Sequence, residues 1–130
     1  MLRPEYIPLI QALTESTHNG VLNWVKGNSY QSYVCSPTTD QKLLIDKYYS
    51  LAENQTITCV NLTIFKSNDE IIDEIVLCRA VDVVENYDLL ENLYKEVEIQ
   101  YYKEKGKNIP PVLTHITESL QQRNHGLAHP

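Results

Sequence analysis

The feature that most constrains the fold is a long stretch, residues 21–79, in which β-branched and aromatic residues alternate with short clusters of turn-forming residues. The turn clusters lie at residues 26–29, 36–40, 52–55 and 66–70 and divide the stretch into about five strands. Connections this short join antiparallel neighbours, because parallel neighbours need a long crossover. The stretch therefore predicts an antiparallel meander of about five strands.

Apolar side chains within two of these strands predict that one face of the sheet is buried. They lie an even number of residues apart within each strand, which places them on a single face. They are Leu43, Ile45, Tyr49 and Leu51 in the third strand, and Val60, Leu62 and Ile64 in the fourth. We expect the opposite face to be partly solvated.

Helical patterns flank the meander. Residues 4–18 carry an apolar stripe and are followed by Gly20, a typical helix stop. The stronger pattern covers residues 83–105, where Asp82 and Glu85 fit a capping box. Apolar residues then recur at helical spacing. They are Leu90, Leu93, Tyr94, Val97 and Tyr101.

Two adjacent prolines, Pro110 and Pro111, predict that this helix stops, because proline lacks an amide hydrogen and clashes with the preceding turn. A shorter helix over residues 111–122 follows, with Leu113, Ile116 and Leu120 on one stripe. Residues 123–130 are polar, and we expect them to form a flexible tail.

These patterns together predict an α+β fold built on the five-stranded sheet. We expect the helices of residues 4–18 and 83–105 to cover one face of the sheet and the short helix of residues 111–122 to pack at its edge. With 130 residues, of which 42% are hydrophobic, the chain can build one core without a metal or a disulfide. We therefore expect a single domain over residues 1–122. Trp24 should be buried against the first helix, because the chain doubles back after Gly20.

Charge narrows the classes of partner. The net charge is −6, and residues 69–98 contain ten carboxylates opposed only by Arg79 and Lys95. Nucleic acid is disfavoured, since its binding draws much of its affinity from cationic side chains on phosphates. Pro4, Glu5 and Gln11 interrupt the apolar start of the chain, so we expect neither an export signal nor a spanning helix. The expected location is the cytoplasm.

The three cysteines, Cys35, Cys59 and Cys78, are odd in number and lack the spacing of zinc ligands. Each lies in an apolar or strand-like run. We expect three buried, reduced thiols with no metal and no disulfide.

Catalysis has no recognisable residues in this sequence. The four glycines form neither a phosphate loop nor a dinucleotide fingerprint, and no serine or cysteine has a nucleophile motif around it. The densest acidic cluster comprises Asp69, Glu70, Asp73 and Glu74. It lies at a turn between two expected strands and lacks the order of ligands of a calcium loop. We expect a solvated hairpin there, and no cofactor or metal.

The expected long helix defines a candidate partner-binding face. If Leu90, Leu93 and Tyr94 face the sheet, the opposite side of the helix faces solvent, about half a turn away. That side carries Asp88, Glu91, Lys95, Glu98 and Tyr102. It is mainly anionic and suits a basic protein partner, whose approach would be steered by charge.

One resemblance can be stated on this basis. The chain has an opening helix containing Leu13-Thr14, then Gly20, Leu22 and Trp24, a tyrosine-bearing meander, and a late helix with Leu90 and Leu93-Tyr94. This order resembles a group of small bacterial proteins of uncharacterised function, up to about residue 120. The resemblance implies a bacterial cytosolic protein with a helix, sheet, helix architecture, and it implies no catalytic residue.

Two functions remain open. The first is a non-enzymatic protein-interaction or accessory module, antitoxin-like or immunity-like, that uses the residues Asp88, Glu91, Glu98 and Tyr102 or an open sheet edge. The alternative is a small-ligand-binding or hydrolytic protein with a pocket between sheet and helices, lined by Trp24 and several tyrosines. A filled core and an exposed patch favour the first function, whereas a deep pocket favours the second. The sequence leaves the oligomeric state open.

Overall fold

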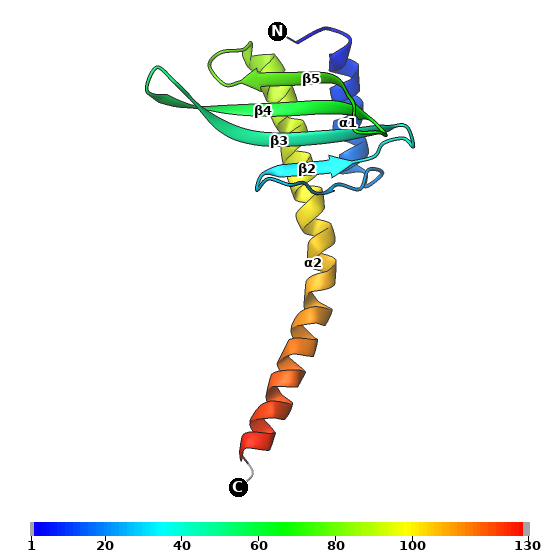
Figure 1. Ribbon diagram of the computed structural model, residues 1–130, viewed down its shortest axis with the longest axis vertical. Helices are drawn as coiled ribbons and strands as arrows, with labels where there is room; N and C mark the ends of the chain where they lie inside the picture. The colour runs from blue at the N-terminus through cyan, green and yellow to red at the C-terminus, as the bar shows by residue number, and fades with distance from the viewer. Residues whose placement is uncertain (1, 129–130) are drawn as a thin grey trace.

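The computed structural model describes residues 2–128 (Figure 1). Its elements, in chain order, are α1 (Tyr6–His18), β1 (Val25–Lys26), β2 (Ser32–Cys35), β3 (Gln41–Ala52), β4 (Gln55–Lys66), β5 (Ile71–Cys78) and α2 (Val84–Ala128). The strands form one sheet in the order β1-β2-β3-β4-β5, each antiparallel to the next. Both helices lie on the same side of this sheet. The predicted α+β fold with an antiparallel meander is confirmed.

The longest hairpin of the sheet joins β3 and β4, which pair over twelve residues each. Its two turn residues, Glu53 and Asn54, have φ values of 51° and 64°, and two positive φ values are typical of the tight turns that match the strand twist. The tip of the hairpin extends past the neighbouring strands (Figure 1). Tyr49 and Leu51 lie there and are 61% and 80% exposed. The prediction that they belong to the buried face is wrong, because neither of the two described helices reaches the tip of the hairpin.

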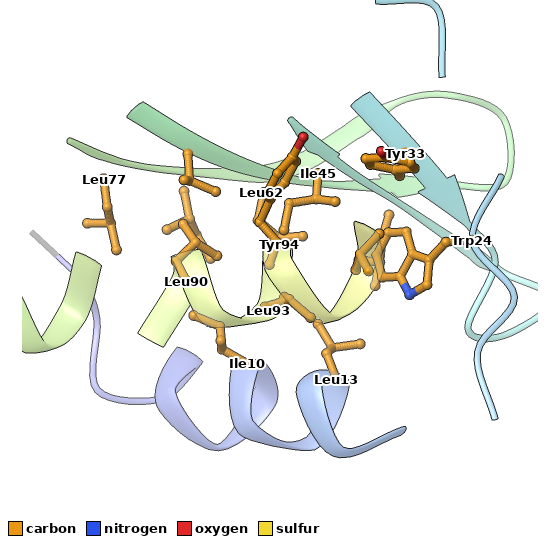
Figure 2. Close-up of a cluster of buried hydrophobic side chains, with 14 of the residues drawn as sticks. Ile10, Leu13, Trp24, Tyr33, Ile45, Leu62, Leu77, Leu90, Leu93 and Tyr94 are labelled. Atoms are coloured by element: carbon orange, nitrogen blue, oxygen red, sulfur yellow. The ribbon is translucent and has the colours of Figure 1, made fainter. Parts of the chain in front are cut away.

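The core fills the space between the inner face of the sheet and the first half of α2. Cross-strand neighbours on this face are Tyr33, Ile45 and Leu62 of β2, β3 and β4. They pack against the side of α2 that carries Leu90 and Tyr94 (Figure 2). These five side chains are at most 2% exposed. The middle of the sheet therefore depends on α2 for its cover.

Helix α1 packs mainly on α2, which therefore lies between α1 and the sheet. Ile10 and Leu13 of α1 face Leu93 on the side of α2 that points away from the sheet (Figure 2). Near the start of α1, the Tyr6 hydroxyl donates a hydrogen bond to Asp73 of β5. The two helices share one side of the sheet as predicted, but they form successive layers.

Trp24 is buried, as predicted, with 2% exposure. Its indole Nε1 donates a hydrogen bond to Thr17 Oγ1 in the last turn of α1, at 3.0 Å. The Thr17 hydroxyl in turn donates to the Leu13 carbonyl at 2.7 Å. The buried indole N–H and the buried Thr17 hydroxyl therefore both have hydrogen-bond acceptors. The contact holds the chain against α1 just after Gly20. The φ of Gly20, 74°, allows the chain to reverse there.

The expected break of the helix at the two prolines does not occur. Helix α2 runs without interruption from Val84 to Ala128, with Pro110 and Pro111 inside it. The expected third helix, residues 111–122, is therefore the outer part of α2, and it stands away from the sheet instead of packing at its edge (Figure 1). The expected flexible tail, residues 123–130, is helical as far as Ala128. Residues 129 and 130 lie outside the described residues.

A disulfide joins Cys59 of β4 to Cys78 of β5, which corrects the prediction of three free thiols. The two residues are direct partners in the antiparallel register, with Cα atoms 4.1 Å apart. A separation of 19 residues in sequence does not reveal this register. The prediction is confirmed for Cys35, which is unpaired and buried, and burial raises the pKa of its thiol to about 12.

Replacement of Trp24 by alanine should lower the free energy of unfolding by about 3 to 5 kcal/mol, because it removes a fully buried ring and a paired donor. Urea denaturation measures this change. Val21→Ala, at a position 73% exposed, is the matched control and should shift stability by no more than about 0.5 kcal/mol. Equal midpoints for the two variants would place Trp24 outside the core.

Thiol titration of the denatured, unreduced protein should find one free thiol per chain, that of Cys35, and three after reduction. The disulfide closes a loop of 19 residues, so its reduction should cost about 3 kcal/mol of stability. In a Cys59→Ala/Cys78→Ala variant the reductant should have no such effect. Three free thiols before reduction would show that the disulfide does not form.

Candidate functional site

The four residues expected to form a partner-binding face lie on α2 in different surroundings. Asp88 is exposed and Tyr102 is 48% exposed. Glu98 is half-buried and accepts a hydrogen bond from the Tyr94 hydroxyl at 3.3 Å. The Glu91 side chain is only 12% exposed, so its predicted solvent position is wrong. The half-turn argument fails here because α2 is covered on two sides, by the sheet and by α1.

Glu91 instead joins α2 to the sheet. Its carboxylate accepts a hydrogen bond from the Tyr87 hydroxyl, pairs with Lys95 Nζ at 3.0 Å, and lies 3.9 Å from Lys47 Nζ of β3. Burial by itself would raise the pKa of Glu91, but the Tyr87 hydrogen bond and the two ammonium groups together hold the pKa below its ordinary value. This is a structural contact between layers.

Because the folded-state pKa of Glu91 is lowered, its ionised form should stabilise the protein above about pH 4.5, and this contribution should disappear as the pH falls through the lower folded value. Glu91→Gln should cost about 1 kcal/mol at pH 7 and less at pH 3. Denaturation at both pH values measures the difference. Asp88→Asn, on the exposed side of the same helix, should change stability little at either pH. Equal losses in both variants would contradict this role.

A cluster of tyrosines marks the point where α2 leaves the domain. Lys26 Nζ lies 4.6 Å from the ring centroid of Tyr33 and 5.5 to 5.9 Å from those of Tyr30, Tyr101 and Tyr102. The same ammonium donates a hydrogen bond to the Tyr30 carbonyl at 2.8 Å. Cation–π contacts of this kind tie β1 and its loop to α2. The direction in which the helix leaves the domain is therefore fixed at its base.

Beyond this cluster α2 projects alone, as Figure 1 shows in its orange and red part. Together with Tyr102 at its base, the projecting part carries an apolar stripe. Ile109 lies seven residues after Tyr102, and the next members follow at intervals of four, three and four residues. We call this stripe the distal stripe: Tyr102, Ile109, Leu113, Ile116 and Leu120. Its members are 42% to 56% exposed, and Val112 beside it is 55% exposed. Large side chains at this spacing are typical of a helix that packs against another helix.

The projecting helix is weak on its own. Gly106, Pro110 and Pro111 together disfavour a helix by about 7 kcal/mol relative to alanine. The prolines also deprive the carbonyls of Gly106 and Lys107 of their helical donors. Within the described chain no sheet or helix packs against this segment to compensate, and tertiary packing supplies most helical stability in proteins. The segment therefore needs a partner to be a stable helix.

The outer face of the sheet, away from the helices, is a second open surface. At its centre Asp46 of β3 lies opposite Asn61 of β4. The Oδ1 atom of Asp46 is buried and has no hydrogen-bond partner among the described residues. Burial raises the pKa of Asp46, the charge of Glu74 adds to this, and a hydrogen bond with Asn61 acts in the opposite direction. The ionised Asp46 carboxylate therefore destabilises the folded sheet at neutral pH.

The alternative of a ligand pocket between sheet and helices finds no support in the core. Trp24, expected to line such a pocket, is 2% exposed and packs in the filled interior, as does Tyr94. A surface hollow of about 620 Å³ lies elsewhere, beside the β1–β2 edge, and is lined by residues such as Val21, Leu22 and Val34. The aromatic rings of the core therefore pack against one another as part of the fold.

The acidic cluster near the β4–β5 turn is occupied by contacts within the chain. Asp69 pairs with Lys42 at 2.7 Å, and Glu70 pairs with Lys66 at 3.4 Å. Asp73 accepts the hydrogen bond of Tyr6. In the part of the chain that the structure describes, no three His, Cys, Asp or Glu side chains converge as metal ligands do.

Comparison of the chain with protein-family models, with curated proteins and with solved structures gives no match. Among the described residues, no helix is both long and apolar enough to cross a lipid bilayer. Leu113, Ile116 and Leu120 form a stripe in the sequence, and the expectation was that this stripe packs at the sheet edge. Their heptad spacing to Tyr102 and Ile109 was the signal that could have identified the distal stripe.

Proposed function

We propose that this chain is a non-enzymatic protein-interaction module and that the projecting part of α2 is its contact element. The observation that carries this proposal is the exposed distal stripe on a helix that the rest of the described chain leaves uncovered. An apolar stripe at heptad spacing is the surface that a helix buries against another helix. The globular part then serves as a rigid base, held to α2 through its core.

The filled interior supports binding at the outer surface. The largest aromatic side chains of the core are buried against one another, for example Tyr33 and Tyr94, whose ring centroids are 5.9 Å apart. A ligand between sheet and helices would have to displace such packed rings, at a cost of several kcal/mol. No comparable cost opposes contact along the projecting helix.

The expected partner is an amphipathic helix of a protein. After Lys107 the projecting segment carries only Glu118 and Arg123 as charged residues, apart from its histidines, so apolar contact dominates. This charge pattern and the net charge of −6 both argue against nucleic acid. Tyr102 is the one residue of the expected acidic face that belongs to the distal stripe. Binding of a basic partner at Asp88 and Glu98 remains a separate prediction, as does an antitoxin-like or immunity-like role.

Two observations bear on the cellular compartment. The sequence resemblance implies a bacterial cytoplasmic protein, and we keep the cytoplasm as the expected location. The Cys59–Cys78 disulfide argues in the other direction, since disulfides persist mainly in oxidising compartments. The redox state of these two thiols in the cell therefore discriminates between the compartments.

Site-specific photo-crosslinking in the cell tests the contact element. A photoreactive amino acid at position 113, on the distal stripe, should give a crosslinked protein species, because the partner helix covers this side. The same amino acid at position 115, on the other side of the helix, is the matched control and should give little product. Mass spectrometry of the product identifies the partner, and immunoblotting measures the yield.

The absence of product from position 113, or equal yields from positions 113 and 115, would reject the distal stripe as the binding surface. Crosslinks confined to positions 88 and 98 would support the acidic face in its place.

A further inference from the structure

We infer that the partner of the distal stripe is a second copy of the same chain, and that the two projecting helices pair antiparallel. This inference rests on the proposed function and identifies its partner. Written as a heptad, Leu113 and Leu120 take one core position (a), whereas Tyr102, Ile109 and Ile116 take the other (d). All five side chains are exposed in the single chain, which leaves the stripe ready for a partner.

The residues that flank the stripe favour self-association. In helix pairs, charged residues at the flanking positions select the partner by attraction and exclude others by repulsion. The flanking positions carry Lys103 and Lys105 beside Tyr102 at the base of the segment. From residue 110 to residue 124 they carry Pro110, Val112, Thr117, Ser119 and Asn124, none of which is charged. Over residues 110–124 two copies can therefore approach without like-charge repulsion, and this part of the helix lacks the charges that would select a different helix.

The two irregular positions of the heptad favour the antiparallel orientation. Gly106 occupies an a position and Arg123 a d position. In a parallel pair Gly106 would face its own copy across a void, and Arg123 would face another Arg123. In an antiparallel pair a positions meet d positions: Leu113 lies beside Ile116 of the other copy, and Arg123 lies beside Gly106. The aliphatic stem of the arginine can then cover the glycine while its charge reaches solvent.

Gly106 supports the same arrangement independently. A Cβ atom at this position would meet nothing within 4 Å in the described chain, and the glycine lies inside a regular helix. The described chain therefore contains no steric reason for glycine there, although glycine weakens a helix relative to alanine. Close approach of a second backbone or a long side chain supplies such a reason.

Pairing also resolves the weakness of the projecting helix. In this register residues 106–123 of the two copies lie side by side over about 27 Å of helix, and pairing over that length buries Ile109, Leu113, Ile116 and Leu120 of both copies. Burial of the leucine and isoleucine side chains offsets the cost of Gly106, Pro110 and Pro111 to the helix. Helix formation in this segment is thus coupled to association.

Sedimentation velocity of the purified full chain tests the inference. The protein should sediment with twice its chain mass of 15.0 kDa at tens of micromolar, and its circular dichroism at 222 nm should weaken on dilution. Leu113→Glu/Leu120→Glu should shift the protein to the monomer and weaken self-association at least 100-fold. The matched control, His115→Glu/Gln122→Glu, carries the same two glutamates seven residues apart on the other side of the helix and should remain a dimer.

The orientation is tested by single cysteines in the full chain. Antiparallel pairing places residue 120 beside residue 109 of the other copy and about 16 Å along the helix from the other residue 120. A mixture of Leu120→Cys and Ile109→Cys should therefore form a mixed disulfide dimer under mild oxidation, whereas Leu120→Cys alone should not. A dimer bridged through residue 120 of both copies would overturn the antiparallel arrangement.

A full chain that stays monomeric at 100 micromolar would overturn the inference, and so would an equal loss of dimer in the two glutamate variants. Trp24 fluorescence shows whether each variant keeps its folded core. The proposed function fails separately: it falls if position 113 gives no crosslinked protein in the cell. A monomer in solution together with a crosslink to a different protein would keep the function and reject the second copy.

Discussion

The structure depends on the burial of the first half of α2 between the sheet and α1. Leu90 and Tyr94 face the sheet, whereas Leu93 faces Ile10 and Leu13 of α1 (Figure 2). A helix with apolar residues on two sides can act as the middle layer, and here it is the main contact of both other layers. Among the described residues, no other element covers the centre of the inner face of the sheet. Loss of this packing would leave both the sheet and α1 without a core.

Polar contacts around this layer set the position of the helix more than they add stability. Glu91 connects α2 to Lys47 of β3, and Lys26 holds the base of the projecting segment among four tyrosine rings. Such contacts contribute modestly in free energy, but they define the register and direction of the helix. Through them, one continuous helix links a packed domain to the exposed segment that we propose as the contact element.

The two halves of α2 illustrate how one secondary structure can be stable for different reasons. In the first half, tertiary packing offsets the entropy of ordering the chain. The second half contains weak helix formers, and its apolar stripe is exposed. Within a single chain, packing therefore does not offset the entropy of ordering this half. The two halves differ in their exposed apolar area and not in their helical pattern, and this difference supports the proposed interaction role of the second half.

The sequence by itself determined the strands, their antiparallel order, the first helix, the packed first half of the second helix and the burial of Trp24, because these follow from local periodicity, short turns and the reversal after Gly20. It also showed the stripe of Leu113, Ile116 and Leu120. Only the tertiary structure decided that this stripe faces solvent, that Glu91 is covered and that Cys59 meets Cys78. The physical reason is that periodicity fixes which side chains share a face, whereas strand register and the distance between layers decide what each face meets.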